Sequence, residues 1–415
     1  MFSSTKTSLR RARISPWRVR DRRYDGRVKA PDVIVCGAGV IGCAIARELA
    51  SAGAAVTVVE RGRPGEEASG AAAGLLTTQA DIASDSPFAR LCRESGALYP
   101  ALVASLARET GIDVPFTVCG TLRVAADAED ARAMSELAAW QESVGWTIER
   151  VSGGRLVELS GRTLSPEFRE GLYFREEAVI DNRELVRALQ ISAESRGARF
   201  VTGRPAVAVI IESRACVGVV TPEGNMAAGA VIDAAGCWAA FDPALSFPIP
   251  IRPLRGQIVE LAADEGPPPC VLHCGGFYVA PRERGRILLG STVEDVGFDN
   301  AVTAGAVEDL VSRAISLAPR LSGARFVAAW SGLRPVAPDG LPILGETPLA
   351  NFYLATGHFR NGILLAPATA RVLVDAVLGR RTDVDVVPFG LARFDASGPD
   401  DGPFRFRFTG GNASW

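Results

Sequence analysis

The segment ATGHFRNGILLAPAT (355–369) combines two glycine turns with the start of an apolar helix. The chain turns at Gly357 and again at Asn361-Gly362, and a helical apolar pattern then continues to about Leu378. The first backbone N–H groups of a helix have no acceptor within that helix, and the helix dipole adds partial positive charge there. The segment is therefore predicted to stabilise negative charge on a bound group.

A second glycine motif, CGAGVIG (36–42), lies near the other end of the chain. Gly37, Gly39 and Gly42 match the pattern G-x-G-x-x-G, and Glu60 follows 18 residues after Gly42. In dinucleotide-binding proteins the first glycine permits a tight turn, the second admits the pyrophosphate, and the third lets helix and strand pack closely. The acidic residue accepts hydrogen bonds from a ribose diol. The motif alone is weak evidence for dinucleotide binding, because glycine is common in this chain. The predicted strand before it and helix after it make it specific for such a site.

The elements that must position these motifs follow from the apolar pattern. DVIVC (32–36) and AVTVVE (55–60) are predicted to be buried strands, and residues 41–52 the helix between them. The small-residue loop SGAAAGLL (69–76) and the later strand and turn VIDAAGCWA (231–239) follow. Both allow the backbone to approach an extended flavin dinucleotide closely. The simpler interpretation of the second segment is an ordinary buried strand and turn.

Nucleotide-binding patterns recur in three separate stretches, which predicts an α/β fold with a discontinuous, Rossmann-like cofactor domain. A second, α+β substrate domain with an antiparallel sheet is predicted from the segments between them, and the site is expected between the two domains. The predicted division is 31–87, 172–245 and 326–385 for the cofactor domain, and 88–171 and 246–325 for the substrate domain.

Scarce residue types restrict the chemistry. The only lysines are Lys6 and Lys29, so the body lacks the lysine of a pyridoxal enzyme or a P-loop NTPase. The only histidines are His273 and His358, which argues against a histidine-based metal site or a Ser-His-Asp triad, and we predict no metal. Eight scattered cysteines without a CxxC pair are typical of free thiols in a reducing compartment, so a cytoplasmic location is expected.

Charge is divided unevenly along the chain. Residues 1–30 carry a net charge of +8 and the remainder −10, and an acidic body argues against nucleic acid as a partner. No apolar run is long enough for a membrane span. The basic arm, 1–30, is expected to be disordered or to follow from a start codon assigned too early, with a transit peptide as the alternative. The tail, 392–415, is expected to be mobile.

Several segments together resemble the D-amino-acid oxidase family of FAD enzymes, and most of all its glycine oxidase branch in thiamine biosynthesis. The resemblance covers about residues 32–380 and rests on these segments in order: GAGVIG, SGAAAGLL, VIDNRELVRAL, AAGCWA, RPLRGQIVEL, GLRPVAPDGLPILG and GHFRNGILLAPAT. RGQ and the last segment are its most specific parts. The discontinuous domain is thus expected to bind FAD.

The resemblance implies roles for individual residues. Arg334 is expected to bind a substrate carboxylate through its planar guanidinium, Tyr278 to hydrogen-bond the same group, and Arg360 to lie near the flavin or the entrance. His358 is expected to pack near the flavin ring rather than to act as a catalyst. The expected cofactor-binding residues are Gly37, Gly39, Val40, Ile41, Gly42, Glu60, Arg61, Ser69, Ala72, Gly74, Leu75, Val207, Gly236, Trp238, His358, Arg360, Asn361, Gly362, Ile363 and Leu364.

The implied reaction is FAD-dependent oxidation of glycine or a small amine or D-amino acid. Hydride passes from the substrate Cα to flavin N5, and oxygen takes the electrons, giving an imine or glyoxylate, ammonia and hydrogen peroxide. The FAD is expected to be non-covalent, because no cysteine follows Cys274 and the loop 69–76 lacks histidine. The resemblance implies a homotetramer. The alternatives are a D-amino-acid dehydrogenase that uses a quinone or a partner protein, and a non-enzymatic flavin-holding subunit.

Overall fold

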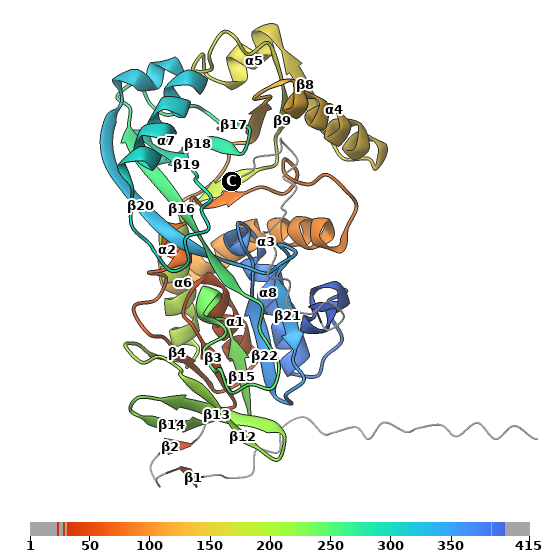
Figure 1. Ribbon diagram of the computed structural model, residues 1–415, viewed down its shortest axis with the longest axis vertical. Coiled ribbons are helices and arrows are strands. Elements are labelled where there is room, and N and C mark those ends of the chain that lie inside the picture. The colour runs from red at the N-terminus through yellow and green to blue at the C-terminus, as the bar shows by residue number, and fades with distance from the viewer. Residues whose placement is uncertain (1–22, 25–27, 30, 383, 395–415) are drawn as a thin grey trace, which may run out of the picture.

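The computed structural model describes residues 23–24, 28–29, 31–382 and 384–394 of the chain. Two large sheets dominate the molecule (Figure 1). The lower one in this view has six strands, parallel except for the last, in the order β11 (Arg199–Val201), β4 (Val56–Val59), β3 (Val33–Cys36), β15 (Ala230–Asp233), β22 (Phe352–Thr356) and β21 (Ile343–Glu346). This confirms the predicted α/β fold and its first βαβ unit.

Two apolar helices leave the carboxyl ends of these parallel strands. Helix α1 (Val40–Ser51) follows β3, and helix α8 (Gly362–Val377) follows β22. Both are buried around most of their circumference because they pack against each other, and α6 (Asn182–Ser195) and α3 (Pro87–Thr110) cover their outer sides. Parallel strands with helices over them place the free helix N-termini at one edge of the sheet.

The second large sheet has eight strands and lies above the first in Figure 1. Its neighbours are antiparallel except for one parallel pair, β17 with β7. Helix α7 (Ala304–Leu317) packs on it, and α4 (Ala128–Ser143) and α5 (Gly153–Leu159) lie at its far end. Its order is β20 (Arg325–Val336), β16 (Arg252–Ala262), β19 (Arg286–Gly290), β18 (Phe277–Pro281), β17 (Val271–Cys274), β7 (Thr121–Val124), β9 (Glu170–Phe174) and β8 (Glu149–Ser152).

The long strands β16 and β20 run from the upper region of the molecule toward the parallel sheet (Figure 1). Their register pairs Leu254 with Arg334 and Gly256 with Gly332. Sheet membership differs from the predicted division at β9 and β20, which belong to the eight-stranded sheet, and at β6 (Phe116–Val118), which pairs with β10 (Ala178–Ile180). The division into domains stays a proposal.

Two three-stranded sheets complete the described fold. One joins β5 (Leu75–Leu76), β10 (Ala178–Ile180) and β6 (Phe116–Val118); the other joins β12 (Ala208–Glu212), β13 (Ala215–Thr221) and β14 (Gly224–Ala227). The four-residue helix α2 (Ala68–Ala71) precedes β5.

The predicted arm and tail fall mostly outside the described residues. Within the arm, β1 (Arg23–Tyr24) pairs with β2 (Val28–Lys29). At the start of the predicted tail, Leu391–Phe394 forms a 3₁₀ turn, in which Leu391 is buried and the guanidinium of Arg393 bonds the carboxylate of Asp339.

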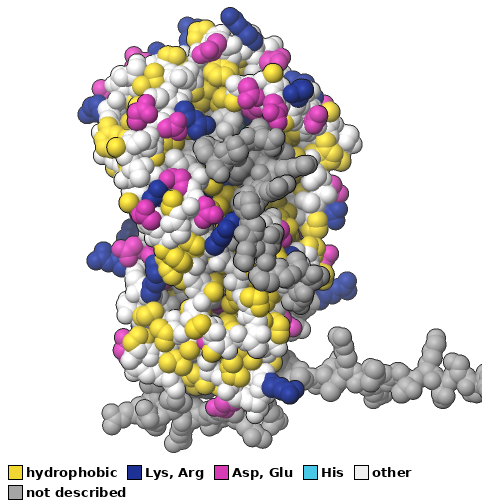
Figure 2. All heavy atoms as spheres, viewed as in Figure 1, with side chains coloured by type: hydrophobic (Ala, Val, Ile, Leu, Met, Phe, Trp, Pro, Cys, Tyr) yellow, Lys and Arg dark blue, Asp and Glu magenta, His cyan; other side chains and the backbone are white. Residues whose placement is uncertain are grey.

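No helix in the described ranges combines the length and the hydrophobicity needed to cross a membrane. On the face drawn in Figure 2, acidic and basic side chains are interspersed.

Candidate functional site

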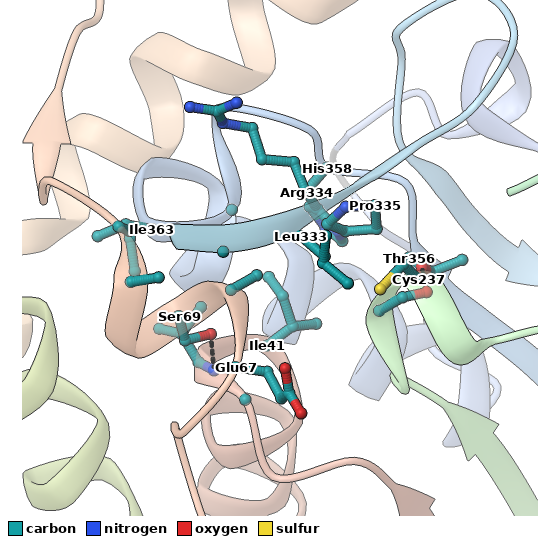
Figure 3. Close-up of a pocket in the computed structure, with 18 of the residues that line it drawn as sticks. Ile41, Glu67, Ser69, Cys237, Leu333, Arg334, Pro335, Thr356, His358 and Ile363 are labelled. Atoms are coloured by element: carbon teal, nitrogen blue, oxygen red, sulfur yellow. Dashed lines mark hydrogen bonds between the residues drawn. The ribbon is translucent and has the colours of Figure 1, made fainter. Parts of the chain in front are cut away.

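A large cavity lies where the carboxyl ends of β3, β15 and β22 meet strands β16 and β20. In Figure 3, Arg334 and His358 lie on one side of it and Ile41 and Ser69 on the other, with Cys237 and Thr356 together at one end. The cavity therefore joins both predicted glycine motifs, which are far apart in the sequence. Of the predicted residues, these line it: Gly37, Gly39, Val40, Ile41, Glu60, Arg61, Ser69, Ala72, Gly74, Leu75, Gly236, Trp238, Tyr278, Arg334, His358, Arg360, Asn361, Gly362 and Ile363.

The first glycine motif has the geometry that close approach requires. Gly37 has φ +99°, and a Cβ there would lie 2.5 Å from the carbonyl oxygen of Ala234. A Cβ on Gly42 would lie 1.9 Å from the carbonyl oxygen of Gly37, so Gly42 acts by packing and does not line the cavity. The Val40 N–H donates to the Ser69 hydroxyl at 2.9 Å, which ties the start of α1 to the small-residue loop.

Glu60 stands at the end of β4, beside the same turn. Its carboxylate accepts from the N–H groups of Ala38 and Gly62, each at 2.7 Å, and its side chain is buried. Next to it, the Arg61 guanidinium lies 3.4 Å from the centre of the Trp238 ring and pairs with Glu67. A carboxylate beside a flat cationic and aromatic surface suits a ribose and a base.

Helix α8 directs its N-terminus into the cavity. The first bond within the helix runs from the Leu365 N–H to the Asn361 carbonyl at 2.8 Å, so the N–H groups of Gly362, Ile363 and Leu364 have no acceptor in the helix. Gly362 and Ile363 line the cavity, whereas Leu364 is buried beneath it. Helix α3 holds this first turn of α8 in place. The Ser95 hydroxyl donates to the Leu364 carbonyl at 2.6 Å, and the Tyr99 hydroxyl donates to the Ile363 carbonyl.

Arg334 projects from β20 at the opposite wall. Its guanidinium donates to the Ser291 hydroxyl at 2.7 Å and to the carbonyls of Thr292 and Arg255 at 3.0 and 3.3 Å. Within the described part of the chain, no carboxylate forms an ion pair with it. Burial lowers the pKa of Arg334 to about 10, which still leaves it cationic at neutral pH. A largely buried cation held by neutral acceptors is a binding site for an anion.

Glycines make the room for both anion-binding side chains. A Cβ on Gly256 would lie 2.0 Å from Arg334 Nη2, and one on Gly290 would lie 2.2 Å from the Tyr278 hydroxyl oxygen. Strand register explains both contacts, since Tyr278 pairs with Gly290 and Gly256 lies across from Gly332. Burial raises the pKa of Tyr278, so its hydroxyl keeps its proton and can donate.

The loop after β22 brings His358 and Arg360 to the cavity. The Phe359 N–H donates to the Pro335 carbonyl at 2.8 Å, so this loop is joined to the end of β20. His358 is buried, its Nε2 lies 3.1 Å from the Thr369 hydroxyl, and burial lowers its pKa to about 3. A neutral, packed imidazole agrees with the expectation that His358 is not a catalyst. Arg360 pairs with Asp81 at 3.2 Å.

Three predicted residues do not line the cavity: Gly42, Leu364 and Val207, the last of which is 41% exposed. Several residues line the cavity without having been predicted from the sequence, among them Thr77, Asp81, Gly256, Ser291 and Thr356. Gly256 lies within the RGQ segment, and that signal could have been used. Asp81 and Ser291 stand in loops without a motif, so only the tertiary structure reveals them.

The site fits a flavin dinucleotide along its length. The Gly37–Gly39 turn and Glu60 suit the pyrophosphate and ribose, the small residues 71–74 permit close approach, and the α8 N-terminus suits a group that gains negative charge. Residues 32–376 match the model of the FAD dependent oxidoreductase family, and the chain belongs to this family. It is an enzyme with FAD as its cofactor.

The relatives of this chain indicate which members of the FAD dependent oxidoreductase family it is similar to. Glycine oxidase from Geobacillus kaustophilus is 34% identical over 87% of this chain and 97% of its own length. The crystal structure of glycine oxidase from that organism superposes with a TM-score of 0.83, covering 88% of this chain and 98% of that one. The bifunctional protein ThiO/ThiG of Trichormus variabilis is 34% identical over 88% of this chain but only 55% of its own length. Iminodiacetate oxidase from Chelativorans sp. BNC1 has a TM-score of 0.78 at 25% identity, covering 86% and 98% of the two chains.

Proposed function

We propose that this protein oxidises glycine, or a comparably small amine with one carboxylate, and passes the electrons to oxygen. The observation that carries the proposal is Arg334, a largely buried guanidinium without a carboxylate partner in the described chain, facing the cavity that holds both glycine motifs. The glycine oxidase relatives support the choice of substrate. When bound, FAD accepts a hydride from the substrate Cα.

The chain's own residues bind and orient the substrate. Arg334 takes the carboxylate through two parallel N–H donors, and the Tyr278 hydroxyl donates to the same group. The N–H groups at the start of α8 stabilise negative charge at the flavin side of the cavity without reorganisation. No side-chain base is required if the amine enters unprotonated, and the lowered pKa of His358 makes its imidazole a weak base.

The mode of FAD binding, the location, the oligomeric state and the biosynthetic role are inferred from the relatives and from the sequence. We propose non-covalent FAD, a cytoplasmic homotetramer, and a role in making the thiazole of thiamine, the last supported by the ThiO/ThiG relative. Acid precipitation that leaves the yellow colour in the supernatant supports non-covalent binding, whereas colour in the pellet overturns it.

A peroxide-coupled assay tests the reaction. Purified holoenzyme is given glycine, sarcosine, D-alanine and D-proline under air, and in parallel without oxygen but with an artificial acceptor. We expect peroxide with glycine or sarcosine as the best substrate. Turnover only with the artificial acceptor would show that the electrons pass to an acceptor other than oxygen. Flavin that none of the four substrates bleaches under anaerobic conditions would overturn the oxidation itself.

A further inference from the structure

The loop Gln79–Ile82 presents Asp81 to the cavity and is held by three polar side chains from other elements. Glu177 Oε1 accepts from the N–H groups of Gln79 and Ala80 at 3.0 and 2.8 Å. Gln141 Nε2 donates to the carbonyls of Gln79 and Ile82, both at 2.8 Å. Arg123 Nη1 donates to the Ala80 carbonyl at 2.8 Å. The backbone on both sides of Asp81 is therefore anchored.

These anchors carry a cost in stability. Arg123, Gln141 and Glu177 are at most 1% exposed, and buried polar groups are unfavourable unless fully hydrogen-bonded. Glu177 Oε2 and Gln141 Oε1 have no hydrogen-bond partner among the described residues. Apolar side chains would fill the same space more favourably but would not hold the loop backbone in place. The arrangement maintains the position of Asp81.

Asp81 is surrounded by groups that keep it ionised. Its Oδ2 lies 3.2 Å from Arg360 Nη2, and its Oδ1 lies 4.0 Å from Nε2 of His273. Burial opposes ionisation, but the positive charge of Arg360, with that of Arg123 behind it, outweighs this effect, and the pKa of Asp81 falls below its usual value. His273 is buried, neither of its ring nitrogens is hydrogen-bonded in the described structure, and burial lowers its pKa to about 4. The imidazole is thus neutral, and Arg360 provides the charge opposite Asp81.

This pairing sets the charge at the substrate end of the cavity. Arg334 and Arg360 line the same cavity, and after burial the Arg360 charge also lowers the pKa of Arg334, so the two cations are within electrostatic range. Asp81 neutralises Arg360, and Arg123 is paired in turn with Asp130 at 2.9 Å. Of the arginines that line the cavity in the described chain, Arg61 pairs with Glu67 and Arg360 with Asp81, and Arg334 has no carboxylate partner, which matches one carboxylate of a substrate.

We propose that Asp81 is a specificity-determining residue, which restricts the cavity to amines with one carboxylate by occupying Arg360. A dianionic amine, of which iminodiacetate is the simplest probe, binds poorly because its second carboxylate finds Arg360 already neutralised and is repelled by Asp81. The inference rests on the proposed amine oxidation. Beyond that reaction, the inference assigns the selection between monoanionic and dianionic substrates to the side chain of Asp81, which lies outside the glycine motifs.

The test compares Asp81→Asn with a matched control, Asp85→Asn. Asp85 lies in the same stretch of chain and pairs with Arg90 in the same way, but its side chain is more exposed than that of Asp81 and does not line the cavity. We expect Asp81→Asn to raise the ratio of kcat/KM for iminodiacetate over glycine by about tenfold or more, because one unit of like charge is removed within a few ångströms. Asp85→Asn should leave the ratio at its wild-type value.

A binding measurement separates this inference from the proposed reaction. Titration of the flavin absorbance with acetate and with malonate, one a monoanion and the other a dianion, needs no turnover. In Asp81→Asn the Kd of malonate relative to acetate should fall by about the same factor, and adding Arg360→Gln to that variant should cancel the gain. An unchanged malonate-to-acetate ratio, or a gain that survives in the double variant, overturns the inference even when glycine is oxidised.

The single variant Arg360→Gln covers the case in which Asp81→Asn does not fold. It leaves Asp81 without its cation and should weaken malonate more than acetate; equal weakening of the two counts against the inference. If wild-type enzyme binds these anions as described but does not oxidise glycine, the charge selection stands and the proposed reaction fails.

Discussion

The two walls of the cavity recognise charge by opposite means. The wall built on the parallel sheet acts through backbone and through missing side chains: Gly37 and Gly39 at the first turn, and the free N–H groups at the start of α8. The wall built on the eight-stranded sheet acts through side chains, Arg334 and Tyr278, which fit because Gly256 and Gly290 leave space for them. Substitutions at the first glycine turn should therefore act by loss of cofactor, whereas those around Arg334 should act by loss of turnover with FAD still bound.

Gly37→Ala should have the largest effect. The new Cβ would lie 2.5 Å from a backbone oxygen at a φ of +99°, so the turn must deform and FAD binding should be lost. FAD per chain after desalting and the Tm measure this. The control is Gly53→Ala, also at positive φ (+87°) but with nothing within 4 Å, which should keep its FAD at a cost of about 1 kcal/mol in stability. Equal loss in both variants would contradict the role of close approach.

Arg334→Lys should retain FAD and lose activity. A lysine cannot reproduce two parallel donors, and kcat/KM for glycine should fall by about 10²–10³. Steady-state kinetics and the flavin spectrum check this, with Arg187→Lys on the exposed face of α6 as the control. A variant that loses FAD as well would break the comparison between the two walls.

Gly256→Ala tests the space around the guanidinium without changing a charge. The added Cβ would meet Arg334 Nη2 at 2.0 Å and push the guanidinium aside, so kcat/KM should fall by about tenfold or more while FAD stays bound. Gly305→Ala in α7, where nothing lies within 4 Å, should be neutral. Normal kinetics of Gly256→Ala would show that the guanidinium can shift freely.

Ile363→Pro asks whether the other wall acts through its backbone. Proline is tolerated in the first turn of a helix, so the variant should fold and bind FAD, but with one fewer N–H the flavin potential should fall and turnover should drop by about tenfold. Ile363→Ala keeps the N–H and should retain both. A normal potential and normal turnover in the proline variant would refute the assignment.

Glu177→Gln should have the smallest effect, which is a change in how the stability of the fold depends on pH. Burial raises the pKa of Glu177 to about 7 from 4.5, so the native state holds a proton that the unfolded state releases. Its contribution is complete below about pH 4.5 and is lost as the pH rises through about 7. Denaturant midpoints at pH 5 and pH 8 should differ less in Glu177→Gln than in the wild type. An unchanged difference would mean that Glu177 does not titrate in this range.

Much of the cofactor wall could be predicted from local patterns. A strand, a glycine turn and a helix are all contiguous in sequence, so Gly37 to Gly42, Glu60 and the turn before α8 were identified together with the type of ligand. Val207 was predicted to bind the cofactor; it is 41% exposed and does not line the cavity, although its neighbours Pro205 and Ala206 do.

The substrate wall was predicted only where a motif carried it. Arg334 and Tyr278 stand in segments that resemble a family, whereas Asp81 and Ser291 are in loops of ordinary composition. Their positions depend on long-range contacts. The backbone around Asp81 is held by Glu177, Gln141 and Arg123, and the Ser291 hydroxyl accepts from Arg334 on β20.

By itself, the sequence determined the fold class and the dinucleotide turn, because these depend on glycines and apolar periodicity within short stretches of chain, and its resemblance to a family of FAD enzymes indicated the cofactor. The tertiary structure decided how charge is distributed around the substrate. Whether an arginine can bind a carboxylate depends on which acidic residue lies within a few ångströms of it. For Arg360 that residue is Asp81, 279 residues earlier in the chain.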